Sequence, residues 1–264
     1  MRPIHQNLGS PPFMESTLNN PIYWSLIPMP ADWTANPPGD DFSFLSPAER
    51  VKLASLRLPK RRTEWLHGRR IAKQLLFNCF PQLAGSDPAQ VSVLNTLSGA
   101  PYFADANGMA LPLALSLSHR AGWAACAVTD SPGLSIGIDL ECIEPRADSF
   151  METFFTVEEI ATTRSFNGVQ RDVWITLVWS MKEAALKALR QGLRLDTRSI
   201  QIQPTDSITG EATDWQSIGV QCSQTAPAHW STWFMRRDAL LISMAITWKT
   251  EQNTFQLLQS DFTF

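Results

Sequence analysis

The turn signals of this chain, set against its apolar runs, restrict it to a fold that mixes long helices with short strands. The strongest turn signal in the middle of the chain is Asp130-Ser131-Pro132-Gly133. On each side of it, a stretch with helical apolar spacing is followed by short apolar runs separated by turn residues. Strands joined by short turns pair antiparallel, so the pattern predicts an α+β fold. An internal duplication is one interpretation of the two similar halves.

The expected helices and strands follow from periodicity and from helix start and stop signals. Ser46 followed by Pro47 is typical of a helix N-cap with proline at the first helical position. Pro81 ends one long helix and Gly192 follows another. The predicted helices are residues 63–80, 150–166 and 171–190, with a shorter one after Ser46. The predicted strands are residues 21–30, 91–94, 114–117, 123–128, 135–140, 199–203, 218–221, 230–235 and 240–248.

Composition narrows the class of partner. The 264 residues are 44% hydrophobic and 18% charged, which suffices for a sizeable core. The 22 basic and 25 acidic residues leave a net charge of −3, which argues against a nucleic-acid or membrane-surface binder. The four cysteines form no CxxC pair, and no apolar run approaches the roughly 20 residues of a membrane helix. We therefore expect a reduced, soluble, cytoplasmic protein, in which a local basic cluster meets any anionic ligand.

The sharpest short motif is Gly137-Ile138-Asp139-Leu140-Glu141. Alternate residues of a strand share a face, so the carboxylates of Asp139 and Glu141 should point the same way, about 6.5 to 7 Å apart. Two carboxylates so placed can hold one hard cation or work as an acid/base pair. Two solvated acids at the end of a strand are an equally open interpretation.

A second motif, WSMKEAALKA, occupies residues 179–188. Glu183 and Lys187 are four residues apart, so they are neighbours on one helix face. Taken alone, this spacing is most often a surface ion pair. The apolar residues around the two charges make the helix poorly solvated, and a buried carboxylate and ammonium generally need a reason to be there.

Basic and hydroxyl residues precede these motifs. The run LSLSHR, residues 115–120, ends an apolar strand, and a Ser-His-Arg cluster there can donate hydrogen bonds to phosphate oxygens. A lone histidine at a strand end is more often structural. Upstream, KRRTEWLHGRR spans residues 60–70, in which Arg61 and Arg69 lie about two helical turns apart and could grip an anion. Most of this cluster is expected to be a solvated face.

Taken in order, SLSH, GIDLE and WSMKEAALKA resemble the motifs of the 4′-phosphopantetheinyl transferase superfamily, in particular the type that activates siderophore and surfactin synthetases. The resemblance covers roughly residues 45–195. It implies two similar α/β halves related by a pseudo-twofold axis, each with an antiparallel sheet and packed helices, and an active site in the cleft between them. Residues 1–20 would be a loose lead-in, residues 21–132 the N-terminal half and residues 133–264 the C-terminal half.

The resemblance implies an enzyme that moves the 4′-phosphopantetheine arm of coenzyme A onto a serine of an apo acyl or peptidyl carrier protein and releases 3′,5′-ADP. The implied cofactor is Mg²⁺, and a monomer is expected. Either Glu183 or a metal-bound water would deprotonate the serine, and Lys187 would protonate the leaving group. The implied metal ligands are Asp139, Glu141 and Glu183; the catalytic residues are Glu183, Lys187 and Asp139; the coenzyme A contacts are Arg61, Arg69, Ser118, His119, Lys182 and Lys187.

Two departures from the family pattern stand out. Gly99-Ala100-Pro101 lacks the basic residue that the family often places between this glycine and proline, and Arg190-Gln191-Gly192 replaces a GxG pattern. The arginines of residues 190–195 could receive an acidic carrier helix or could simply cap the helix end. Three alternatives remain: a non-catalytic relative that binds coenzyme A or a carrier protein, a metal-dependent phosphatase or nuclease, and a scaffold.

Overall fold

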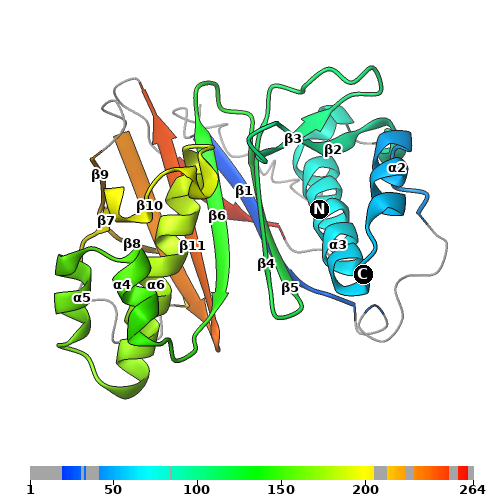
Figure 1. Ribbon diagram of the computed structural model, residues 1–264. Coiled ribbons are helices and arrows are strands. Elements are labelled where there is room, and N and C mark those ends of the chain that lie inside the picture. The colour runs from blue at the N-terminus through cyan, green and yellow to red at the C-terminus, as the bar shows by residue number, and fades with distance from the viewer. Residues whose placement is uncertain are drawn as a thin grey trace, which may run out of the picture.

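The computed structural model describes residues 20–30, 33, 42–83, 85–204, 213–223, 229–249 and 255–260. Nearly all of the lead-in expected over residues 1–20 lies outside the described residues. Two sheets lie in the middle of the molecule, and the long helices cover them from opposite outer sides (Figure 1).

In the described part of the chain's first half, one strand is followed by two α-helices and then by four strands. Ser46 caps the first helix through a reciprocal bond pair with Glu49, and Pro47 begins it, as the sequence predicts. The elements are β1 (Asn20–Pro28), α2 (Pro47–Ser55), α3 (Pro59–Cys79), β2 (Ser92–Asn95), β3 (Pro101–Ala104), β4 (Ala114–Arg120) and β5 (Trp123–Thr129).

The second half begins after the turn at residues 130–133 and runs through a comparable series. Its helices are α4 (Asp148–Phe154), α5 (Val157–Thr163) and α6 (Gly168–Ala188), followed by the short 3₁₀ turns η3 (Gly192–Arg194) and η4 (Thr197–Ser199). Its strands are β6 (Ser135–Cys142), β7 (Ile200–Ile202), β8 (Gln216–Ser217), β9 (Val220–Cys222), β10 (His229–Arg237), β11 (Leu240–Trp248) and β12 (Phe255–Gln259).

The two large sheets have related strand orders. One is β12-β1-β5-β4 and the other is β6-β11-β10-β8. Within them, β1-β5-β4 and β6-β11-β10 pair antiparallel throughout, and each half adds a two-stranded antiparallel sheet, β2-β3 or β7-β9. The mixture of helices with mainly antiparallel sheets confirms the predicted α+β class.

Apolar side chains fill three layers. The inner faces of the two sheets share one core, which includes Ile22 and Ala125 of the first sheet and Ile138 and Met244 of the second. The other faces are covered by α3 and α6, whose apolar stripes are fully buried against the sheets. This arrangement leaves the adjoining edges of the two sheets, β4 and β6, side by side in the middle of the molecule (Figure 1).

Three sequence-based expectations need correction. Residues 150–166 form two helices instead of one, because Thr156 and Glu159 make a capping box that starts α5 after the extended Phe155. Strand β3 was not expected. The C-terminal strand β12 was not expected either, and it pairs parallel with β1 in the first half's sheet. The division at residues 132 and 133 therefore does not separate all the sheet pairings.

Across the described part of the chain, none of the helices is both long and apolar enough to cross a membrane.

Candidate active site

A close approach of strand β6 to helix α6 builds the site. A Cβ atom added to Gly137 would lie 1.9 Å from the carbonyl oxygen of Ala184 and 2.7 Å from the backbone nitrogen of Ala188. Only glycine on the strand, facing alanines on the helix, permits this separation. The contact places the last two turns of α6 directly over the strand that carries Asp139 and Glu141.

Asp139 and Lys187 meet across this contact. The Nζ atom of Lys187 lies 2.7 Å from Oδ1 of Asp139 and 3.1 Å from the carbonyl oxygen of Ile138. Asp139 is 4% exposed, and its second carboxylate oxygen, Oδ2, has no hydrogen-bond partner in the structure. A buried carboxylate oxygen without a donor is costly, which makes it a ready ligand atom for a cation or a substrate donor.

Glu141, two residues further along β6, is held by three side chains. Trp179 donates its indole N–H to Oε1 at 3.0 Å. Arg120 and Arg146 lie 3.3 Å and 3.2 Å from Oε2, and both also contact Glu144. Burial and the neighbouring Asp139 raise the pKa of Glu141, while the two arginines and the indole oppose this shift.

Glu183 belongs to the same electrostatic cluster. Burial raises its pKa, the negative charges of Asp139 and Glu141 raise it further, and Lys187 opposes both effects. The raised pKa means that these carboxylates repel one another in a poorly solvated place. A cation bound among them would relieve that repulsion.

Across the described residues, no three His, Cys, Asp or Glu side chains form a group that could hold a metal ion by themselves. The expected convergence of Asp139, Glu141 and Glu183 into a complete ligand set is therefore not present in this structure. In this structure Glu141 is engaged with two arginines and Asp139 with Lys187. The donor set still fits Mg²⁺ in part, because this ion commonly takes one or two carboxylates and completes its shell with water and substrate phosphates.

Ser118 is not a free phosphate donor. Its hydroxyl donates to Oδ1 of Asp139 at 2.9 Å and accepts the backbone N–H of Leu140 at 3.2 Å. Ser116 accepts the N–H of Ile138 in the same way at 2.9 Å. A hydroxyl has one proton to donate, so the coenzyme A contact expected of Ser118 is corrected to a bridge between the β4 and β6 edges.

His119 faces away from these bridges and is exposed. Nearby protein atoms still exclude water from part of its ring, which lowers its pKa, and the charges of Glu64 and Asp139 oppose this shift. The positive charges of Lys187 and Arg69 lower the pKa further. His119 therefore lies within electrostatic reach of both the carboxylate cluster and helix α3.

Arg61 and Arg69 do not form the expected pair. Arg61 is exposed near the start of α3, whereas Arg69 is 8% exposed and lies over the ring of Trp65 at 4.2 Å. Arg69 donates to Oδ1 of Asn95 at 2.9 Å, and its Nε atom has no partner in the structure. Burial lowers the pKa of Arg69 to about 10, and Glu49 opposes the shift.

Lys182 also lies elsewhere than expected. Its side chain is fully buried and its Nζ atom contacts Glu159 at 2.9 Å and the carbonyl oxygens of Thr197 and Ile200. An ammonium enclosed by three oxygens cannot also bind coenzyme A, so this contact is corrected to a structural one.

A cavity of about 200 Å³ opens beside Lys187, lined from the first half by the turn between β2 and β3 and by part of β4. Arg190 and Gly192 close it from the second half, and both have positive φ angles, which give this loop its shape. The active site that the sequence resemblance implies in the cleft between the halves stays a prediction. A larger cavity of about 650 Å³ near α5 contains none of the predicted residues.

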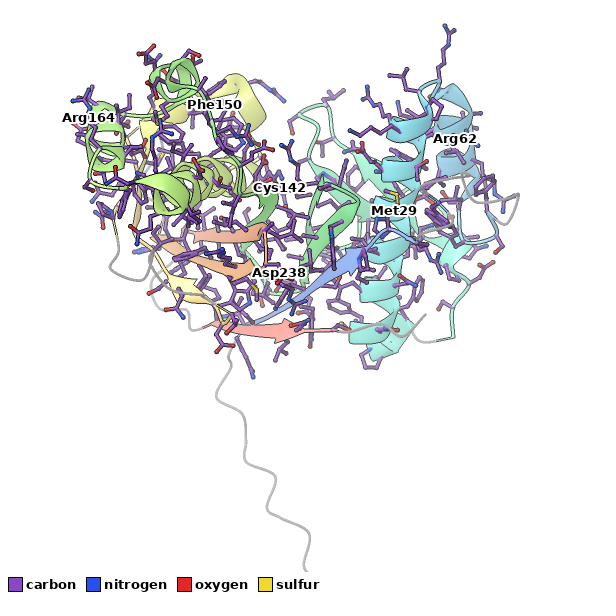
Figure 2. The ribbon with its side chains drawn as sticks, turned by 90° about the horizontal axis from the view of Figure 1, so that it is seen from below. Met29, Arg62, Cys142, Phe150, Arg164 and Asp238 are labelled. Carbon is purple, nitrogen blue, oxygen red and sulfur yellow. The ribbon has the colours of Figure 1, made fainter. Side chains whose placement is uncertain are left out.

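Sequence reasoning gave no role to Arg146 or Trp179 and treated Arg120 only as part of a phosphate-binding Ser-His-Arg cluster, although all three side chains hold Glu141. The available signal was their position next to the motifs: Arg120 follows SLSH, Arg146 follows GIDLE by five residues and Trp179 opens WSMKEAALKA. In Figure 2, Arg62 lies on the helices of the first half and Phe150 and Arg164 on those of the second, with Cys142 at the end of β6 between them.

A family model and several curated proteins match this chain. The model of the 4′-phosphopantetheinyl transferase superfamily matches residues 135–244, which contain β6, α6 and both carboxylate motifs. A 4′-phosphopantetheinyl transferase of Bacillus subtilis is 30% identical over 141 residues, which are 53% of this chain and 59% of that protein. The 4′-phosphopantetheinyl transferase HetI of Nostoc sp. is 29% identical over 205 residues, 76% of this chain and 82% of its own.

Two further comparisons cover less of this chain. The 4′-phosphopantetheinyl transferase Sfp of Bacillus subtilis is 28% identical over 104 residues, 39% of this chain and 45% of that protein. A solved holo-(acyl-carrier-protein) synthase of Bacillus anthracis, in complex with CoA (3′,5′-ADP), superposes with a TM-score of 0.37 at 18% identity and covers 44% of this chain and 96% of its own. The family model over residues 135–244 and the curated relatives show that this chain is similar to the 4′-phosphopantetheinyl transferase superfamily.

Proposed function

We propose that the protein transfers the 4′-phosphopantetheine arm of coenzyme A to a serine of an apo acyl or peptidyl carrier protein and releases 3′,5′-ADP. The observation that carries this proposal is the contact of Lys187 with Asp139, whose buried second oxygen has no partner, beside Glu141 and Glu183. Similarity to the superfamily and the names of the relatives support it.

In the proposed reaction, the serine hydroxyl attacks the pyrophosphate phosphorus that bears the pantetheine arm. A new P–O bond forms to the serine, and the P–O bond to 3′,5′-ADP breaks. Glu183 would accept the serine proton, because its raised pKa makes it a stronger base than an ordinary glutamate. Lys187 lies next to it and would meet the charge that develops on the leaving phosphate and supply its proton.

We propose that Asp139, Glu141 and Glu183 hold Mg²⁺ together with substrate phosphate oxygens. When bound, the ion would offset the charge of the pyrophosphate. Binding would require Glu141 to exchange at least one arginine contact. Arg120 and Arg146 would then be released beside the phosphates, where their guanidinium groups can interact with anions.

We also propose that the two halves are related by a pseudo-twofold duplication. The shared order of strands, helices and small sheets in the two halves supports this. The turn between β2 and β3 and the loop around Arg190 would then enclose part of coenzyme A in the cavity beside Lys187. The monomeric state and the cytoplasmic location stay predictions.

The test is to incubate the protein with coenzyme A, Mg²⁺ and a panel of apo carrier proteins and to measure carrier mass. We expect the mass to rise by one phosphopantetheine group on at least one carrier, and 3′,5′-ADP to appear in equal amount. Binding of coenzyme A without any mass change across fatty-acid, polyketide and peptide-synthetase carriers would favour the non-catalytic alternative.

A further inference from the structure

Two buried ion pairs lie outside the proposed chemistry. Lys182 contacts Glu159 at 2.9 Å, and Lys73 contacts Glu49 at 2.6 Å. All four side chains are at most 3% exposed. A buried ion pair does little for stability by itself, because removing two charges from water offsets their attraction. Each pair therefore calls for a positional explanation.

The second-half pair joins three elements. Lys182, on α6, also donates to the carbonyl oxygens of Thr197 and Ile200, at the start of β7. Glu159, at the third position of α5, accepts the backbone N–H of Thr156 at 2.8 Å through Oε2 and that of Ile202 at 2.8 Å through Oε1. The ammonium and the carboxylate are thus fully hydrogen-bonded, and together they tie α6 to α5 and β7.

The first-half pair has the same construction. Lys73, on α3, donates to the carbonyl oxygens of Phe44 at 2.7 Å and Pro88 at 3.0 Å. Glu49, again at the third position of its helix, accepts the N–H groups of Ser46 at 2.9 Å and Val93 at 2.8 Å. Each half therefore contains a capping-box glutamate that reaches a lysine on the long helix and an N–H of the first strand of the small sheet.

The two pairs differ in what lies next to the lysine. Lys182 directly precedes Glu183, and Lys187 lies five residues after Lys182 on the same helix. The corresponding neighbours of Lys73 are Gln74 and Asn78, which are uncharged. Because α6 and β6 touch at Gly137 and Ala184, a small shift of α6 would move the ammonium of Lys187 off Asp139.

From these contacts we infer that Lys182 and Glu159 are positioning residues, which fix α6 along and about its axis so that Glu183 and Lys187 face Asp139. The role rests on the proposed transferase function. Neither residue touches the reacting atoms. The two act through α6, which also carries Glu183 and Lys187. The pair Lys73–Glu49 fixes α3 in the same way, and it does not contact the cluster of Asp139, Glu141 and Glu183.

The experiment compares two matched variants, Glu159→Gln and Glu49→Gln. Each removes one buried carboxylate charge and keeps the size of the side chain, so both should lower the melting temperature. We expect Glu159→Gln to lower kcat at least about 10-fold with the KM for coenzyme A nearly unchanged, because misplacing catalytic groups by a fraction of an ångström is costly. Glu49→Gln should keep kcat within about 2-fold, measured well below both melting temperatures.

A double variant separates position from stability. Lys182→Met combined with Glu159→Gln removes both charges, so that neither buried charge is left without its partner. We expect the melting temperature to recover while kcat stays low. If kcat recovers together with the melting temperature, or if Glu49→Gln lowers kcat as much as Glu159→Gln, the pair is only structural and the inference is wrong.

Hydrogen exchange gives a readout that needs no activity. In Glu159→Gln, backbone amides of α6 around residues 179–189 should exchange faster than in the parent protein, while those of α3 should not change. Unchanged exchange in α6 would overturn the positioning role even if transfer activity is absent. If Glu159→Gln speeds exchange in α6 but the parent protein transfers nothing to any carrier, only the proposed function is contradicted.

Discussion

At the scale of single residues, the site depends on which polar atoms have partners. Asp139 uses one oxygen for Lys187 and Ser118 and leaves the other without a donor. Glu141 is occupied by an indole and two guanidinium groups. A phosphate-bound cation could coordinate the free Oδ2 of Asp139 and would offset the negative charge of the neighbouring carboxylates.

The first prediction concerns Asp139→Asn. The change keeps the shape but removes the charge that faces Lys187, and an amide oxygen is a weaker cation ligand. We expect kcat for phosphopantetheine transfer to fall at least about 100-fold, as loss of a charge contact in a transition state does. Steady-state kinetics with a responsive carrier measures it. The control is Asp196→Asn, which breaks the exposed pair with Arg198 and should leave kcat unaltered.

The second prediction concerns His67, which is 1% exposed and has no hydrogen-bond partner at either ring nitrogen. Burial, and then the charges of Arg70 and His119, lower its pKa from 6.5 to about 4. The unfolded chain therefore takes up this proton first as the pH falls. The stability due to neutral His67 is complete above the ordinary pKa and is lost between about pH 6.5 and pH 4.

His67→Phe removes this titration and keeps a ring against Trp33, whose centroid lies 6.2 Å from that of His67. Between about pH 7 and pH 5 we expect the parent protein to lose about 2 kcal/mol more unfolding free energy than the variant. Denaturant unfolding at both pH values measures the difference. Equal losses in the two proteins would show that His67 takes up no proton on unfolding.

At the scale of elements, the contact of α6 with β6 decides the site. Neither element places the proposed catalytic groups alone: β6 presents Asp139 and Glu141, and α6 presents Glu183 and Lys187. They meet because Gly137 faces the backbone of Ala184 and Ala188 without any side chain between.

The third prediction is that Gly137→Ala separates the two elements. Its methyl carbon would overlap backbone atoms that cannot rotate away, so we expect a loss of about 3 kcal/mol of unfolding free energy or more, and a larger loss of kcat than of coenzyme A binding. Gly68→Ala on α3 is the matched control. A Cβ atom there meets nothing within 4 Å, and alanine should stabilise the helix by up to about 1 kcal/mol. Similar melting temperatures for the two variants would contradict the prediction.

At the scale of the whole molecule, the two halves share one core, and one strand of the second half pairs in the sheet of the first. Strand β12 leaves the second half and pairs with β1 of the first. The ring centroid of Phe255 on β12 lies 4.8 Å from that of Trp248 and 6.2 Å from that of Trp233, and both tryptophans are on strands of the second sheet. The halves should therefore unfold together.

The fourth prediction tests this coupling with Phe255→Ala. Loss of a half-buried ring that bridges the sheets should cost about 2 kcal/mol of unfolding free energy and should preserve a single cooperative transition. Calorimetry and denaturant unfolding followed by two probes measure it. Two separate transitions in the parent protein would show that the halves are independent domains.

Local sequence signals were enough for much of this protein. Periodicity and capping predicted α3 and α6 to within a few residues, and turn signals bounded most of the strands. Motif order was enough to find the resemblance to the superfamily. Spacing on a strand or helix predicted that Asp139 shares a face with Glu141, and Glu183 with Lys187.

Only the tertiary structure decided which polar groups are buried and with what partner. The sequence shows Lys182, Lys187, Ser118 and Arg69 as equally polar residues, yet the fold encloses Lys182, turns Ser118 into a bridge and buries Arg69 over an indole. The pairing of β12 with β1 likewise joins opposite ends of the chain. Burial and partner choice depend on segments far apart in the chain, and local patterns contain no information about which of those segments meet.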